Sequence, residues 1–468
     1  MDIDFNLKIF SFKRRISISR EWVRFGIVLL VVLATMFVTY WGSSRIHILL
    51  LVLISGIAGV VALLRKPELG FILIFLGGAF VPYSGPAGVN VTVFIVVLMI
   101  GIWLMDMLVV HREFKLIKSQ ILTPIIVMLL ISVIAFGMGQ IPWFAFANQA
   151  PLDAQLGGFA IYMLSLGCTL ATAHLIRDIK WLKLITWILI GLGSIYIFGR
   201  LTGVPINNLY QGGFTGSMFW TWLTALAFAQ AFFNSELKKA TRILLLCIVL
   251  ATMFVAFIQA NDWKSGWVPP LVAIAIMIGL QYRRLVLLAV PIAVMAVGNL
   301  AVTLIASDEY SWGTRVDAWR IVLEISKVNP LFGLGFSNYY WYTPLIPIRG
   351  WFVNFNSHSQ FVDLIAQVGI LGLLCFLWIF FEIIRLSWKL IQDNRLEGFT
   401  KAYAYAVFAG IIATLVAAFL GDWVLPFVYN VGLTGFRASI LLWIFVGGLI
   451  AIKRLSSKSK NDNREQIN

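Results

Sequence analysis

The chain has 468 residues, of which 60% are hydrophobic and only 12% charged, and its mean hydropathy is +0.90. Soluble globular proteins carry about half apolar and about a quarter charged residues, so the composition excludes a water-soluble enzyme. The net charge of +15 is compatible with binding to nucleic acid, with anionic lipid or with membrane topology signals. The three cysteines all lie inside apolar runs, which excludes a disulfide framework and a paired-cysteine metal site.

Apolar runs follow one another along almost the whole chain. A transmembrane helix needs about 20 mostly apolar residues, within a usable range of about 17–25. The candidate runs lie near residues 25–41, 46–64, 68–83, 89–110, 121–139, 157–174, 181–199, 217–233, 241–258, 267–281, 285–305, 361–384, 402–421 and 436–452. Because the third and tenth runs are short, we expect about 12 to 14 spans. This layout predicts an all-α fold, a polytopic transmembrane helical bundle.

Lysine and arginine residues gather between alternate apolar runs. If the N-terminus is cytoplasmic, most of the 36 basic residues fall on the cytoplasmic side, as the positive-inside rule requires, and the net charge is explained without nucleic acid. The first run is interpreted as a retained span, because no small-residue cleavage site follows it before Trp41. The predicted parts are a cytoplasmic N-terminus over 1–24, a bundle over 25–305, a large outer loop over 306–360, further bundle over 361–452 and a cytoplasmic tail over 453–468.

The predicted outer loop is rich in aromatic residues, which argues against disorder and suits a layer at the membrane interface. Thr314 and Asp317 have the spacing of a capping box, and polar and apolar residues then alternate at helical spacing. We therefore predict an amphipathic helix over 315–328, ended by Asn329-Pro330. Function is expected on this outer face.

Three arginines of the outer side are candidate ligands for an anion. Arg315 lies in the first turn of the predicted helix, Arg320 lies further along it, and Arg200 ends the seventh apolar run. Arginine can hold a phosphate through two parallel hydrogen bonds. The alternative for Arg315 and Arg200 is snorkelling to lipid headgroups, or for Arg315 an ion pair with Asp317 or Glu309.

His358 is the candidate base. In the predicted topology no other histidine lies on the outer side, and His358 stands just before the apolar run 361–384. A helix N-terminus disfavours the imidazolium ion, and a neutral imidazole can accept a proton near pH 7. The alternative is a capping or interfacial histidine. Gly333 and Gly335 either let backbone N–H groups approach an anion or form an ordinary turn.

No metal and no cofactor are expected. The predicted outer loop has one histidine, no cysteine and only scattered carboxylates, without the repeat that metal ligands show.

An ordered set of motifs resembles the signature of the O-antigen ligase/polymerase family, whose members are bacterial inner-membrane proteins. The motifs are Gly313-Thr314-Arg315 with Trp319, the run Asn329–Tyr339, Ser357-His358-Ser359, and Val368-Gly369 with Gly372. Three positions depart from the family pattern. Members often have Asn where Ser359 stands, an acidic residue where Gln367 stands, and Asn where Ser217-Met218 stands.

The resemblance implies a metal-independent, inverting glycosyl transfer of the GT-C kind at the periplasmic face of the plasma membrane. The donor would be a glycan on undecaprenyl diphosphate. The acceptor would be a lipid A–core sugar for a ligase, another lipid-linked glycan for a polymerase, or a protein for an oligosaccharyltransferase of similar layout. His358 would take the proton of the acceptor hydroxyl, Arg315 and Arg200 would hold the diphosphate, and Arg320, Gly333 and Gly335 would join in substrate binding.

Two other classes of function stay open on the sequence. A lipid or polysaccharide transporter of the flippase type predicts a polar path through both leaflets and internal repeats, whereas intramembrane acids are few and no repeat is obvious. A scaffold for envelope assembly would use the outer loop as a docking surface. It would bind its partner without Arg315 and His358.

Overall fold

The computed structural model describes residues 29, 44–85, 88–113, 115–260, 262–282 and 309–465. The chain divides into two compact units, Met1–Arg65 and Lys66–Asn468. The first unit contains helix α2 (Ser44–Arg65). The second unit holds the other described helices.

Helices build the described structure, and the described ranges contain no strand beyond two isolated bridges, Ser84 with Asn90 and Ile348 with Trp351. In the second unit the helices are α3 (Leu69–Phe80), α4 (Val91–Met105), α5 (Leu122–Met138), α6 (Leu152–Leu175), α7 (Ile179–Thr202), α8 (Ser217–Phe233), α9 (Lys239–Phe254), α10 (Lys264–Gln281), α12 (Glu309–Ser326), α13 (Asn338–Tyr342), α14 (Gln360–Gln392), α15 (Gly398–Leu420) and α16 (Gly432–Glu465). Short helical turns are η2 (Asp106–Val110), η3 (Pro205–Leu209), η4 (Val255–Gln259) and η5 (Thr343–Leu345).

Among the described residues, eight helical stretches are long and apolar enough to cross a membrane. They are Val91–Val110, Leu152–Leu175, Ile179–Thr202, Lys239–Gln259, Lys264–Gln281, Gln360–Gln392, Gly398–Leu420 and Gly432–Ser457, and four shorter apolar helices accompany them. The predicted all-α polytopic bundle is confirmed. The third predicted run forms only the 12-residue helix α3, and the tenth forms α10. Apart from Leu29, the predicted runs 25–41 and 285–305 lie outside the described residues.

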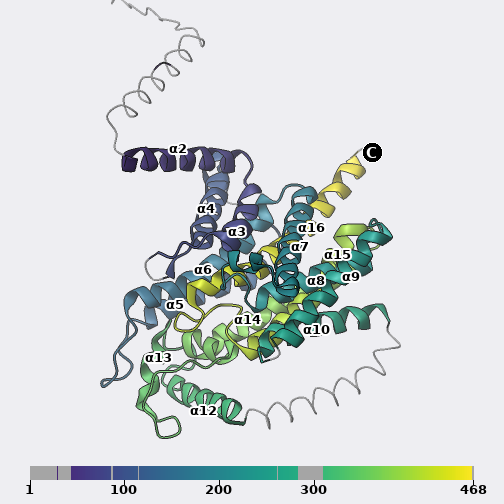
Figure 1. Ribbon diagram of the computed structural model, residues 1–468. Coiled ribbons are helices and arrows are strands. Elements are labelled where there is room, and N and C mark those ends of the chain that lie inside the picture. The colour runs from purple at the N-terminus through teal and green to yellow at the C-terminus, as the bar shows by residue number, and fades with distance from the viewer. Residues whose placement is uncertain are drawn as a thin grey trace, which may run out of the picture. The chain divides into compact units, whose positions relative to one another are not determined.

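The buried centre of the second unit lies where α15 and α16 pack against α8 (Figure 1). Gly410 of α15 faces the ring of Trp222 on α8, and a Cβ at Gly410 would come within 3.2 Å of that ring. The same ring stacks on Phe445 of α16 at a centroid distance of 5.3 Å. Close packing of small residues against large ones stabilises membrane helix pairs, because lipid supplies no hydrophobic force between helices.

Arg437 is a buried charge that the fold itself explains. The side chain on α16 is 4% exposed, and its guanidinium donates to the carbonyls of Gly77, Gly78, Val81 and Tyr83. These carbonyls end helix α3, where backbone acceptors have no partner within the helix and the helix dipole favours a cation. Arg437 therefore caps the C-terminal end of α3.

The predicted outer loop is folded from Glu309 onward. Helix α12 begins six residues before the predicted start and ends at Ser326, so Thr314 lies inside the helix and the predicted capping box is wrong. The cause is tertiary: Trp312 packs edge to face on Trp319 at 5.6 Å, and Phe419 of α15 contacts both rings. Burying Trp312 there extends the helix past the local start signal.

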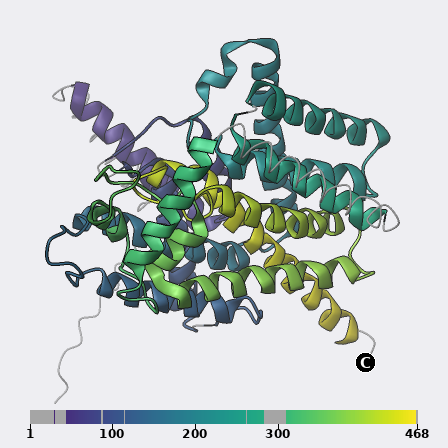
Figure 2. The ribbon, with the colours of Figure 1, turned by 90° about the horizontal axis from the view of Figure 1, so that it is seen from below.

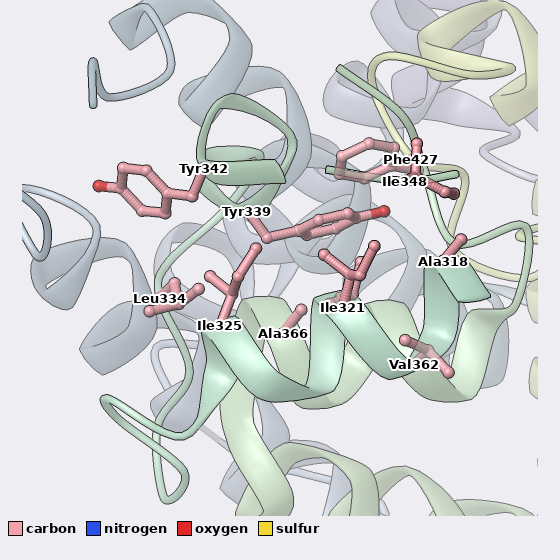
Figure 3. Close-up of a cluster of buried hydrophobic side chains, with 11 residues drawn as sticks. Ala318, Ile321, Ile325, Leu334, Tyr339, Tyr342, Ile348, Val362, Ala366 and Phe427 are labelled. Atoms are coloured by element: carbon pink, nitrogen blue, oxygen red, sulfur yellow. The ribbon is translucent and has the colours of Figure 1, made fainter. Parts of the chain in front are cut away.

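Helices α12 and α13 lie together at one end of the second unit, against α14 (Figure 1). Seen from that end, α12 lies in front of the other helices (Figure 2). Figure 3 shows the hydrophobic cluster that joins them: Ile321 and Ile325 of α12 face Ala366 of α14 and Tyr339 of α13. Phe427, from the connection between α15 and α16, closes the cluster. The segments that carry the sequence motifs therefore share one core.

Candidate active site

A cavity of about 600 Å³ opens beside this cluster. Its walls come from α12, from α13, from the segment before α14 and from the connection between α15 and α16. The lining residues are Thr314, Arg315, Ala318, Tyr340, Ile348, Asn354, Phe355, Asn356, His358, Tyr429 and Asn430. Arg315 and His358 are 43 positions apart in the sequence, yet both line this cavity.

His358 is held in an unusual backbone conformation. Its φ of +49° lies in the left-handed region, which residues other than glycine rarely adopt. Such strain costs about 1–3 kcal/mol and persists only where the surroundings impose it. Ser359 follows with extended backbone as the N-cap of α14, so the prediction that His358 stands at a helix N-terminus is confirmed.

A buried hydrogen-bond network imposes this conformation. Ser357 donates through Oγ to Asp363 Oδ1 at 2.7 Å, and the hydroxyl of Tyr339 donates to the same oxygen. The Ser357 Oγ in turn accepts the backbone N–H of Ser359 at 3.0 Å. Asp363, Ser357 and Tyr339 are all fully buried. The two residues that flank His358 are thus fixed, while His358 itself lines the cavity.

Helix α12 is attached to the same turn. The indole nitrogen of Trp319 donates to the carbonyl of Ser357 at 2.7 Å. This bond fixes the register between α12, which carries Arg315, and the turn that carries His358. The motif residues Arg315, Trp319 and His358 therefore form one geometric unit.

The charge of Arg315 acts on His358. The pKa of His358 is lowered from its usual value, first because partial burial removes hydration from the imidazolium and second because Arg315 lies nearby. The lowered pKa favours the neutral imidazole, the form that can accept a proton. Arg315 also donates to the carbonyl of Leu420 at 3.3 Å. The carboxylate of Asp317 pairs with Arg349 at 2.9 Å.

Arg200 and Arg320 do not line the cavity. Arg320 is exposed on α12. Arg200 ends α7, and its carbonyl accepts a bond from Gln259.

Gly333 and Gly335 have a structural role. Gly333 N–H donates to Asn329 O, and Gly335 N–H donates to Gln367 O, so both amides are bonded within the protein. Both glycines have positive φ, and a Cβ on Gly333 would lie 2.6 Å from the backbone of Gln367. Because both amides are already bonded, they are not available to bind an anion.

The two glycine motifs, Gly333 with Gly335 and Gly369 with Gly372, lie in segments that pack against each other. Helix α14 is broken at Gly369, where φ is +73°, and the freed N–H groups of Ile370 and Leu371 donate to Pro330 and Leu331. A Cβ on Gly369 would overlap the carbonyl of Leu331. The side chain of Gln367, which departs from the family pattern, accepts the backbone N–H of Ser337 at 3.2 Å. These contacts between the segment 330–337 and α14 hold in place the first turns of α14, which follow His358.

Sequence reasoning missed the residues after α15. Asp422 is 2% exposed and accepts bonds from Phe427 N and Asn430 Nδ2. Tyr429 stacks on Tyr340 at 4.4 Å. This connection carries no motif and lies about 65 residues beyond His358 in the sequence, so only its aromatic and amide residues could have drawn attention to it.

Among the described residues, no group of three or more histidine, cysteine or carboxylate side chains is placed to hold a metal ion. The comparison with known families identifies one match: the model of the family described as O-Antigen ligase matches residues 237–377. This range contains Arg315, His358 and both glycine motifs, so the resemblance is confirmed over that part of the chain. No curated protein matches the chain.

Proposed function

We propose that the protein is a bacterial plasma-membrane glycosyltransferase. It transfers a glycan from undecaprenyl diphosphate to a hydroxyl group of an acceptor at the outer face, as an O-antigen ligase or a surface-polysaccharide polymerase. The supporting observation is that a neutral histidine and an arginine line one cavity within the part of the chain that matches the O-antigen ligase family. The basic residues of the sequence favour cytoplasmic termini and a periplasmic cavity.

In the proposed reaction the acceptor oxygen attacks the anomeric carbon of the donor sugar. The new bond forms between that oxygen and the anomeric carbon, while the bond from the anomeric carbon to the diphosphate oxygen breaks. The acceptor proton passes to the imidazole of His358, which its lowered pKa keeps available as a base. Attack opposite the leaving group inverts the anomeric configuration.

Arg315 stabilises the leaving group. Negative charge develops on the diphosphate as the glycosidic bond breaks, and a fixed guanidinium in a partly dehydrated site stabilises that charge. In this scheme the guanidinium of Arg315 stabilises the charge that the diphosphate gains, and no metal takes part. Arg200, which the sequence topology puts on the outer side, is proposed to contact the diphosphate of a donor that extends beyond the cavity.

The test is made with purified protein in proteoliposomes. The donor is a glycan on undecaprenyl diphosphate, the acceptors are a mixed pool, and EDTA is present. Wild type should transfer the glycan and release the lipid diphosphate, whereas His358→Ala should lose transfer by at least about 100-fold. The matched control is His111→Ala, since His111 lines a different cavity with His174 and Arg177.

Other results would contradict the proposal and favour a different class of function. Movement of intact donor between leaflets, in wild type and His358→Ala alike, indicates a transporter. A partner that binds the protein without Arg315 and His358, with no transfer, indicates a scaffold. The product of a successful reaction identifies the acceptor and so separates ligase from polymerase.

A further inference from the structure

Most polar groups in the cavity are uncharged. Arg315 carries the one fixed charge among the lining residues and His358 is neutral, while three asparagines, a threonine and two tyrosines supply the other polar groups. No carboxylate lines the walls. The proposed transfer reaction uses Arg315 and His358 but assigns no role to the asparagines and tyrosines.

Asn356 is a buried amide with an unmet hydrogen-bonding capacity. The residue is only 9% exposed, lines the cavity, and its Oδ1 has no hydrogen-bond partner. Buried side-chain oxygens in native proteins nearly always have a partner, so an orphan at a cavity wall calls for one. A ligand hydroxyl is a donor of the right kind.

The other two asparagines are held in place. Asn354 donates through Nδ2 to the carbonyl of Tyr340 at 2.7 Å, and Asn430 donates to Asp422. The Tyr340 and Tyr429 rings stack on each other, and Trp341 fixes the Tyr429 hydroxyl at 2.7 Å. The cavity thus has a rigid wall of aromatic rings and oriented amides.

We propose that this cavity is the acceptor subsite, that Asn356 accepts a hydrogen bond from a hydroxyl of the acceptor's sugar ring, and that the cavity disfavours a positively charged ring. A sugar ring has apolar C–H faces that pack on aromatic rings and hydroxyls that bond to amides. This inference rests on the proposed function, because the acceptor hydroxyl must reach His358, two residues from Asn356. Arg315 repels a protonated amino sugar.

Binding is measured on the full-length protein in nanodiscs by saturation-transfer NMR, without donor. The probes are the methyl glycosides of glucose and N-acetylglucosamine, and their charged counterparts, the methyl glycosides of glucuronic acid and glucosamine. The uncharged probes should bind to wild type, and Asn356→Leu should weaken that binding about tenfold. Asn208→Leu, a change at an exposed loop asparagine, is the matched control and should bind as wild type does.

A second variant keeps the test valid should Asn356→Leu fail to fold. Asn356→Asp preserves the shape and adds a negative charge, so the preference should shift from the glucose probe toward the glucosamine probe. Unchanged binding in both variants would overturn the proposal, as would tighter binding of the glucosamine probe than of the glucose probe by wild type.

The two proposals fail in different ways. Binding is measured without donor and is therefore read separately from transfer: His358→Ala tests the proposed base through loss of transfer, and Asn356→Leu tests the subsite through loss of binding. If His358→Ala still transfers and Asn356→Leu loses binding, the proposed base is wrong and the subsite stands. If transfer depends on His358 but the uncharged probes do not bind, the subsite is wrong and the proposed function stands.

Discussion

Ser357 donates a 2.7 Å hydrogen bond to Asp363, and this bond ties the residue before His358 to a carboxylate on the first turns of α14. Tyr339 donates to the same oxygen from α13. The candidate base therefore stands on a turn whose strained conformation depends on a carboxylate that does not line the cavity. Asp363 is a positioning residue in this scheme.

Asp363→Ala should lower kcat for transfer about 10–100-fold with little change in KM for the donor, because the turn relaxes and His358 moves. Tyr339 loses the acceptor of its buried hydroxyl, while the hydroxyl of Ser357 can still donate to the carbonyl of Ser359 at 2.9 Å. The free energy of unfolding should therefore also fall, by about 1–3 kcal/mol. Asp363→Asn keeps an oxygen at Oδ1 and should recover most of the rate. Equal loss in both variants would point to a role for the negative charge instead.

Arg315→Gln should move the acidic limb of the pH–rate profile to higher pH. Arg315 lowers the pKa of His358, so its removal raises that pKa, and the active neutral form is then lost at a higher pH as the solution is acidified. The maximum rate should fall as well, because the leaving diphosphate loses a stabilising charge. Rates normalised to each variant's own maximum separate the two effects.

Arg320→Gln serves as the control for that profile. Arg320 is exposed on the same helix and does not line the cavity. Its removal should leave the acidic limb in place and change the rate by no more than a few fold. A shift equal to that of Arg315→Gln would mean that the effect is a general surface potential.

Gly369→Ala should abolish folding or lower the melting temperature severely. The position needs positive φ, and the new Cβ would overlap the Leu331 carbonyl where the two glycine motifs cross. Gly203→Ala is the matched control: φ is +74° and nothing lies within 4 Å of the new Cβ, so only the backbone strain of about 1–2 kcal/mol remains. Thermal unfolding in detergent compares the two, and similar losses would contradict the packing role.

Arg437→Leu should destabilise the protein by about 1–3 kcal/mol without altering the pH profile of transfer. The change removes the guanidinium that donates to four carbonyls at and just after the end of α3. Gly77 O keeps the N–H of Val81, so the expected loss is that of the charge-assisted bonds. Denaturation in detergent measures the loss. A normal stability with a changed pH profile would mean that Arg437 acts at the site and not as a cap.

The sequence alone determined the class of fold, since apolar runs of spanning length and their basic flanks report directly on partition into lipid. It also singled out Arg315 and His358 as candidate site residues from the motifs that carry them, and the structure places both at one cavity. Tertiary structure decided the rest. Helix α12 starts earlier than the sequence predicts because Trp312 packs on Trp319. The Asn329–Gly335 segment packs against α14 at Gly369. Asn356, Tyr429 and Asn430 line the same cavity although they are far apart in the chain. These outcomes depend on contacts between residues far apart in the chain, which local spacing does not encode.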